Sequence, residues 1–192
     1  PTAEGRIGEK GLFRRSNAFR FVGEECRNVM DNVALQDMSA FAKCFISGPG
    51  AEKWLDGILA NRIPKKVGRI ALTHMLTSQG GVRAEFTVYK ARELGYYLVS
   101  AGEFERHDHD YLRKALPVDG SVQMMTVTTA WGVLVLAGSN SRTVLQKLTD
   151  TELSNEVFHW LSGKQYSVGT AWALTMRIDL EGETGYSFHH PI

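Results

Sequence analysis

The sequence predicts an α+β fold built mostly from antiparallel sheets with flanking helices. Helical patterns alternate with pairs of strand-like runs joined by short turns, and such pairs are typical of hairpins. A doubly wound parallel sheet would instead place single strands between the helices. The chain of 192 residues is 43% hydrophobic, which is enough for a real core in one large domain or two small ones.

The N-terminal elements begin after residues 1–16, a polar, glycine-rich stretch without periodicity that we interpret as a flexible arm. Residues 17–192 then form the folded domain. Ser16 or Asn17 is suited to cap a helix whose apolar residues follow a three-and-four spacing. Those apolar residues are Phe19, Val22, Cys26, Val29 and Met30.

The middle of the chain combines two amphipathic helices with several strands. A double glycine, Gly80-Gly81, supplies the positive φ of a hairpin turn between two of these strands. Pro117 ends the second helix. The expected elements are a strand at 40–47, a helix at 51–61, strands at 68–76, 82–90 and 96–101, and a helix at 103–116.

The last third continues the same alternation. Apolar spacing and a second capping pattern predict two short helices, and alternation predicts four more strands. The expected elements are strands at 122–128 and 131–137, helices at 141–148 and 151–160, and strands at 171–178 and 186–189.

Composition excludes several classes of protein. The formal net charge is +1 without a basic cluster, so nucleic acid is not an expected partner. The longest apolar run is too short to span a bilayer, so we expect no membrane insertion, and the N-terminus has no signal-peptide pattern. The segment 48–53 follows a strand and opens a helix, but Lys53 stands where a dinucleotide fingerprint needs its third glycine. We therefore expect no FAD in this chain.

Cysteine and histidine residues do not predict a metal or disulfide site. Cys26 and Cys44 are interpreted as buried free thiols. His107 and His109 are two residues apart on a predicted helix and point in different directions, so we expect a solvated helix face and no bound metal.

The strand after the double glycine carries a candidate carboxylate. Arg83, Glu85 and Thr87 face one side of this strand, and the apolar residues between them face the other. Spacing alone describes Glu85 as a residue on a solvated strand face.

A family resemblance gives this carboxylate a role. The segment 35–90, read with 97–117, 132–155 and 182–192, resembles the folate-binding, aminomethyltransferase-like region of dimethylglycine and sarcosine dehydrogenases, a relative of the glycine-cleavage T-protein. The resemblance implies the N-terminal part of that fold, with further C-terminal subdomains and the FAD domain lying outside this chain. It also implies a location in the bacterial cytoplasm or the mitochondrial matrix.

The resemblance also implies a function. In that family a separate FAD domain oxidises an N-methyl group to an iminium, and tetrahydrofolate captures the one-carbon unit in the folate region. The implied enzyme is therefore part of an oxidoreductase with aminomethyltransferase-type transfer, and its partner is an FAD-containing domain or subunit. Glu85 matches the family's acidic residue after the double glycine and is the implied catalytic and folate-binding residue, since a carboxylate can manage the proton of an attacking amine.

Near the C-terminus the chain matches the family motif only in part. Arg177 and Tyr186 fall on motif positions and are the other implied folate-binding residues. Leu180 replaces a tyrosine that contacts folate, and Ser187 replaces a glutamate that binds the pterin ring. These departures keep a second hypothesis open: a non-catalytic interaction or assembly module, or a small subunit of a sarcosine oxidase-like complex, that has lost folate binding.

Large aromatic residues in the C-terminal part suggest an association surface. Exposed apolar patches of more than a few hundred Å² favour self-association, so we expect a homo-oligomer. The candidate residues are Trp131, Trp160, Trp172 and Phe188.

Overall fold

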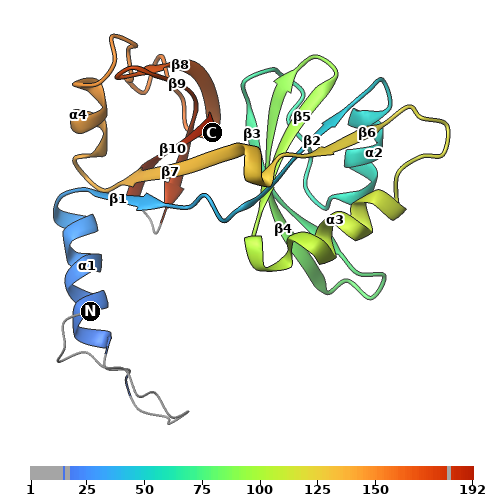
Figure 1. Cartoon of the computed structure of the whole chain (residues 1–192), viewed down its shortest axis with the longest axis horizontal. Coiled ribbons are helices and arrows are strands. Elements are labelled where there is room, and N and C mark those ends of the chain that lie inside the picture. The colour runs from blue at the N-terminus through green and yellow to red at the C-terminus, as the bar shows by residue number, and fades with distance from the viewer. Residues whose placement is uncertain (1–14, 16–17, 181–182) are drawn as a thin grey trace.

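The described residues form two five-stranded antiparallel sheets, which confirms the predicted fold class (Figure 1). The computed structural model describes residue 15 and residues 18–180 and 183–192. The predicted capping residues Ser16 and Asn17, and the 1–16 arm apart from residue 15, lie outside the described residues.

The N-terminal sheet has the strand order β3-β4-β5-β2-β6. One of its faces packs against α2 and α3, where Leu55 and Leu112 are fully buried. Its strands are β2 (Ala42–Ser47), β3 (Ile70–Leu76), β4 (Val82–Arg92), β5 (Gly95–Ser100) and β6 (Gln123–Thr126). Its helices are α2 (Ala51–Ile58), the 3-10 helix η2 (Gly102–Phe104), α3 (Glu105–Lys114) and the 3-10 helix η3 (Thr128–Ala130).

The C-terminal sheet has the strand order β1-β7-β10-β9-β8. The helix α4 (Ser141–Gln146) lies on one of its faces, where Leu145, Tyr186 and Phe188 belong to a common buried cluster. Its strands are β1 (Ala34–Asp37), β7 (Trp131–Ala137), β8 (Ser162–Val168), β9 (Ala171–Leu180) and β10 (Glu183–Pro191).

The two sheets meet through their remaining faces. A buried cluster joins Tyr97 and Val99 of the N-terminal sheet to Leu174 and Met176 of the C-terminal sheet. Edge strands β3 and β8 also approach each other, because the Ile70 amide donates to Leu161 O at 2.9 Å. The helices therefore lie on the outer faces, and the inter-sheet region is closed by side chains.

Among the described residues, one predicted element is absent, and strands β1 and β8 and the 3-10 helix η3 were not predicted. The segment 151–160 forms turns instead of a helix, with Leu153 and Phe158 buried as anchors. Strand β8 escaped prediction because its sequence, SGKQYSV, has few apolar residues, and its register comes from seven pairs with β9. Strand β1 is short and mostly exposed, and it is held by pairing with β7.

Helix α1 (Phe19–Asp31) extends away from the sheets, at the lower left of Figure 1. None of its residues is buried, so the prediction that Cys26 is a buried thiol was wrong, whereas Cys44 is buried as expected. The C-terminal end of α1 is fixed, because the Asn140 amide donates to Asn32 O and Asn28 Nδ2 donates to Val33 O.

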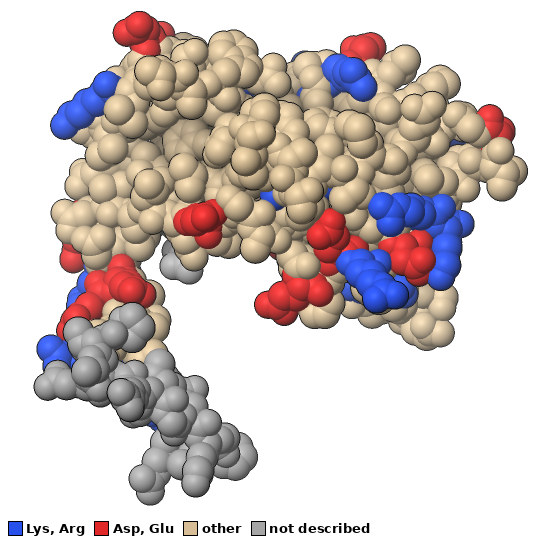
Figure 2. All heavy atoms as spheres, in the orientation of Figure 1, with Lys and Arg blue, Asp and Glu red and all other residues tan. Residues whose placement is uncertain are grey.

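The predicted aromatic surface is only half present. Trp160 and Trp172 are 51% and 59% exposed, whereas Phe188 is buried and Trp131 packs between the sheets. On the face shown in Figure 2, charged side chains of both signs gather at the lower right, where α3 lies, and the lobe of the C-terminal sheet carries few. Among the described helices, none has the length and apolar character needed to cross a membrane.

Candidate functional site

The turn before β4 places the predicted carboxylate. The Thr77 amide donates to Gly81 O at 2.8 Å, and the Gly80 amide donates to Thr77 O at 3.0 Å. Gly80 has φ +82°, a conformation that glycine adopts without strain. The turn closes the β3–β4 hairpin and sets the register in which His74 lies opposite Glu85.

Glu85 lies on the polar side of β4, as predicted. Its side chain is 73% exposed, and Oε2 lies 3.2 Å from His74 Nε2 on the neighbouring strand. Phe86 and Val88, which point the other way, are buried in the core beneath α2 and α3. A single contact thus orients the carboxylate without withdrawing it from solvent.

A cavity of about 220 Å³ adjoins this carboxylate, and we name it the Glu85 cavity. Arg83 and Ser100 line it, and their atoms Arg83 Nε and Ser100 Oγ are buried without a hydrogen-bond partner among the described residues. The rest of the Arg83 side chain is held in place, with the guanidinium 4.4 Å from the centre of the Tyr111 ring and Nη2 3.0 Å from His107 Nε2. The other lining residues are Phe41, Ala84, Thr87, Val99, Ala101, Phe104 and Asp108.

A second cavity, also of about 220 Å³, shares the lining residue Phe41 with the first, and we name it the Ser187 cavity. Ser187 is 2% exposed and is the buried polar residue in its lining. The remaining lining residues are Val29, Ala34, Gln36, Met38, Val135, Ala137 and Ile178. The sequence singles out Ser187 as a departure from the family motif, but no sequence pattern indicates the residues that surround it in the structure.

Arg177 and Tyr186 lie together but apart from Glu85. They are direct partners across β9 and β10, so both side chains lie on the α4 face of the C-terminal sheet. Arg177 Nη2 donates to Asn155 Oδ1 at 2.7 Å, and Arg177 Nη1 donates to Phe158 O. Tyr186 Oη accepts from Arg142 Nε at 3.2 Å, and Arg142 Nη2 also donates to Asn155 Oδ1.

These contacts fasten the 151–160 segment to the sheet, and neither Arg177 nor Tyr186 lines the Glu85 cavity or the Ser187 cavity. Asn155 is the residue of this cluster that sequence reasoning missed, since a lone asparagine in a turn carries no pattern. The side chain of Leu180, which was singled out with Ser187, lies outside the described residues.

The histidine-rich helix α3 is not the solvated face that was predicted. Asp108 and His109 are buried, and burial lowers the pKa of His109, with Glu105 opposing that shift. Asp108 accepts from His107 Nδ1 at 2.9 Å. Within the described residues, no group of three or more His, Cys, Asp or Glu side chains could hold a metal ion.

Cys44 is not an activated nucleophile. Burial raises the pKa of its thiol to about 12, so the thiolate is scarce at neutral pH.

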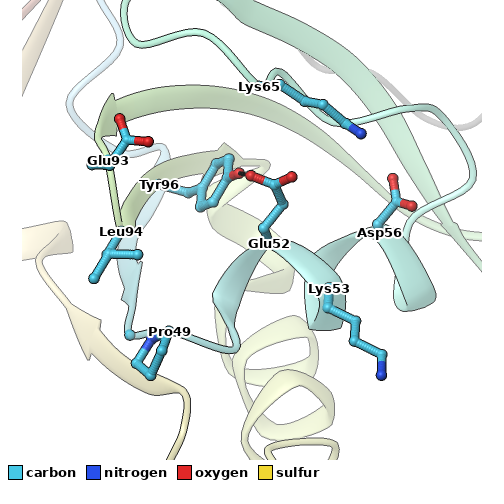
Figure 3. Close-up of a pocket in the computed structure, with 9 residues that line it drawn as sticks. Pro49, Glu52, Lys53, Asp56, Lys65, Glu93, Leu94 and Tyr96 are labelled. Carbon is cyan, nitrogen blue, oxygen red and sulfur yellow. Dashed lines mark hydrogen bonds between the residues drawn. The ribbon is translucent and has the colours of Figure 1, made fainter.

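A third pocket, of about 380 Å³, lies at the start of α2, where the sequence has its glycine-rich turn (Figure 3). Two of its lining residues bind the buried Lys90, whose Nζ donates to Glu52 Oε2 at 3.1 Å and to Tyr96 Oη at 2.9 Å. Hydrogen bonds from Lys90 and Tyr96 lower the pKa of Glu52. Because these polar groups satisfy one another, the triad serves to fasten α2 to the sheet, and the charges at the mouth (Lys53, Lys65, Asp56 and Glu93) are of mixed sign.

Comparison with known proteins assigns the chain to a family. Residues 2–192 match the family described as the GCVT N-terminal domain. The chain is 38% identical over 179 residues to the mitochondrial dimethylglycine dehydrogenase of Homo sapiens, which corresponds to 93% of this chain and 21% of that protein. The chain thus spans about a fifth of the length of this relative.

Two solved structures share the fold. One is the glycine cleavage system aminomethyltransferase T from Bartonella henselae, with a TM-score of 0.73, 20% identity, and coverage of 88% of this chain and 44% of that one. The other is a heterotetrameric sarcosine oxidase from Corynebacterium sp. U-96, with a TM-score of 0.65, 18% identity, and coverage of 94% of this chain and 88% of that one.

Proposed function

The chain belongs to the GCVT N-terminal domain family, and on that premise we propose that it captures a one-carbon unit on tetrahydrofolate within a dimethylglycine dehydrogenase-like flavoprotein. Its partner in this reaction is an FAD-containing, amine-oxidising domain or subunit. The location is the mitochondrial matrix or the bacterial cytoplasm, in line with the mitochondrial relative.

One observation carries this proposal: two residues that line the Glu85 cavity have buried polar atoms that lack a hydrogen-bond partner within the described part of the chain. A buried polar atom without a hydrogen bond costs about 1–3 kcal/mol, so Arg83 Nε and Ser100 Oγ favour a ligand that bonds to them. Beside them, the Glu85 carboxylate accepts hydrogen bonds or a proton. Ligand amines beside Glu85 and ligand acceptors near Arg83 would complete all three groups, and tetrahydrofolate offers both kinds of group.

The chemistry assigned to the chain is positioning and proton transfer. When bound, tetrahydrofolate supplies the amine that attacks the electrophilic carbon. Glu85 holds that amine and accepts its proton, and the ring of His74 limits the rotation of the carboxylate through the 3.2 Å contact. Phe104 and Phe41 add apolar surface to the lining of the cavity.

Calorimetric titration with tetrahydrofolate tests the proposal. We expect saturable binding to the native chain and at least about a tenfold weaker affinity for Glu85→Gln, which keeps the shape and removes the charge. Glu25→Gln, on the exposed helix α1, is the matched control and should bind as the native chain does. Equal affinity of native protein and Glu85→Gln would contradict the assigned role of Glu85.

A non-catalytic role is the second candidate, favoured by Ser187 at the position where the family motif has a glutamate. In this reading the chain is an assembly module or a small subunit of a complex. The sarcosine oxidase structure that shares this fold is heterotetrameric, and this chain covers 88% of the matched subunit. Absence of tetrahydrofolate binding, even with a flavin-bearing partner supplied, together with co-purification with that partner, would favour this role.

A further inference from the structure

Three polar side chains beside the Glu85 cavity are linked to one another, and we name them the Arg83 network. Arg83 Nη2 lies 3.0 Å from His107 Nε2, and His107 Nδ1 lies 2.9 Å from Asp108 Oδ1. Arg83 comes from β4, and the other two residues come from α3. The network therefore connects the strand that carries Glu85 to a helix of the same lobe.

The chemistry of the three groups fixes the direction of both hydrogen bonds. A guanidinium group has donors only, so Arg83 Nη2 donates and His107 Nε2 accepts. An imidazole ring that accepts at Nε2 carries its proton on Nδ1, and this proton is donated to Asp108 Oδ1. The His107 ring is therefore in the Nδ1–H tautomer. The Asp108 side chain, which is 2% exposed, selects that tautomer.

The Arg83 guanidinium is held on two sides and leaves one donor unused. His107 accepts from Nη2, and the Tyr111 ring packs against the guanidinium, with its centre 4.4 Å from Cζ. Arg83 Nε is buried and has no hydrogen-bond partner within the described part of the chain. Because a buried donor without an acceptor is unfavourable and Arg83 lines the Glu85 cavity, a ligand with an acceptor group would complete this site.

Fixing the guanidinium in advance favours binding. An arginine side chain has many rotamers, and a ligand that binds a mobile arginine must restrict them at the cost of affinity. Here His107 and Tyr111 restrict them before a ligand arrives. His107 itself does not line the Glu85 cavity, so an effect of His107 on binding is transmitted through its two partners, Arg83 and Asp108.

We propose that His107 is a positioning residue of the Glu85 cavity: in the Nδ1–H tautomer selected by Asp108, it holds Arg83 so that Nε donates to an acceptor atom of the ligand. Arg83 and Glu85 are two residues apart on β4 and lie on the same side of it, so the cavity offers a donor and an acceptor to one ligand. The inference deepens the proposed function and rests on it for the choice of tetrahydrofolate as the probe.

Replacing His107 tests the proposal through the affinity for tetrahydrofolate. The His107 side chain is 51% exposed, so its replacement does not open the core. We expect His107→Leu to bind at least about fivefold more weakly than the native chain, because Arg83 loses its acceptor. His107→Gln, whose amide oxygen can accept from Arg83, should recover the native affinity to within about twofold. His159→Leu, exposed in the 151–160 turns, is the matched control and should bind as the native chain does.

Nuclear magnetic resonance measures the Arg83 network without a ligand. We expect the ¹⁵N shifts of His107 to report the Nδ1–H tautomer in the native chain and a mixture of tautomers in Asp108→Asn, because an amide can donate as well as accept. The Arg83 Nε–H proton should exchange slowly with water in the native chain and in His107→Gln, and at least about fivefold faster in His107→Leu. A His107 that only filled space would have no fixed tautomer, and glutamine would not restore the slow exchange.

The outcomes separate this inference from the proposed function. Equal tetrahydrofolate affinity of the native chain and His107→Leu, no recovery in His107→Gln, or an Nε2–H tautomer of His107 in the native chain would overturn the inference and leave the proposed function standing. If the native chain does not bind tetrahydrofolate, the proposed function fails. The role of His107 in positioning Arg83 is then decided by the tautomer of His107 and the exchange rate of Arg83 Nε–H.

Discussion

The Glu85 cavity and the Arg177–Tyr186 cluster contain similar chemical groups, but Glu85 is open to solvent and the Arg177–Tyr186 cluster is buried. Glu85 is 73% exposed and, among the described residues, has one hydrogen-bond partner and lies near buried polar atoms that have none. Arg177 and Tyr186 are 8% and 0% exposed. Arg177 donates to Asn155 and Phe158 in the 151–160 turns, and Tyr186 accepts from Arg142 of α4, although Arg177 Nε has no partner among the described residues. A motif position alone therefore does not separate a ligand contact from a structural one, whereas the exposure of the side chain and the hydrogen bonds of its terminal groups do.

The largest effect that we expect from this comparison is the loss of stability when Arg177 is replaced. Arg177→Met keeps much of the volume but leaves Phe158 O and Asn155 Oδ1 without this donor. We expect the free energy of unfolding to fall by about 3 kcal/mol, because hydrogen bonds to charged groups contribute about 1.5–3 kcal/mol each. Urea denaturation measures it, with exposed Arg62→Met as the control. A loss below about 0.5 kcal/mol would show that the cluster is not structural.

The pH dependence of stability tests the burial of His189, whose ring lies 3.0 Å from Tyr97 Oη and 2.8 Å from Ser187 Oγ. Burial, with Lys43 and His190 adding to it, lowers the pKa of His189 from 6.5 to about 3, so the unfolded chain takes up a proton near pH 6.5 while the folded chain does not. The folded state is therefore fully favoured above pH 6.5 and loses about 2 kcal/mol between pH 7.5 and 5.

Denaturation at a series of pH values measures this loss, and His189→Gln should remove most of it. His109, whose pKa is also lowered by burial, contributes a remainder of the same sign. An unchanged pH slope in His189→Gln would contradict the assignment.

The smallest expected effect belongs to Glu85. Because its carboxylate is mostly exposed and His74 is its one hydrogen-bond partner in the described ranges, Glu85→Gln should change the free energy of unfolding by less than about 0.5 kcal/mol. Together with weaker tetrahydrofolate binding, this result would separate function from stability in one variant. A large loss of stability would place Glu85 among the structural residues.

The sequence predicts most of the fold because the signals for its elements are local. The β3–β4 hairpin follows from two glycines and two alternating runs, and Glu85 follows from its place after them. Strand β8 and the turns at 151–160 depend on partners far along the chain, such as Arg177, which no local pattern reports.

The sequence predicted only one of the residues on which the Glu85 cavity depends, namely Glu85 itself. Alternation places Glu85 on the polar face, but Ser100 lies on another strand of the sheet, and its unpaired hydroxyl depends on packing. His189 on β10 interacts with Ser187 on the same strand and with Tyr97 on β5. Only the contact of the two sheets brings Tyr97 and His189 together.

The order of the strands has a consequence for how the chain folds. The N-terminal sheet uses residues 42–126, which lie between β1 and β7, so the C-terminal sheet is interrupted in sequence by the other sheet. On a ribosome, the N-terminal sheet can assemble once its own strands have emerged, whereas β1 must wait for β7. Such long-range pairing closes a large loop and is slow, so β1 and the C-terminal end of α1 stay unanchored until β7 is in place. The C-terminal sheet is complete only when β10, which follows β8 and β9 in the chain, pairs with both β7 and β9.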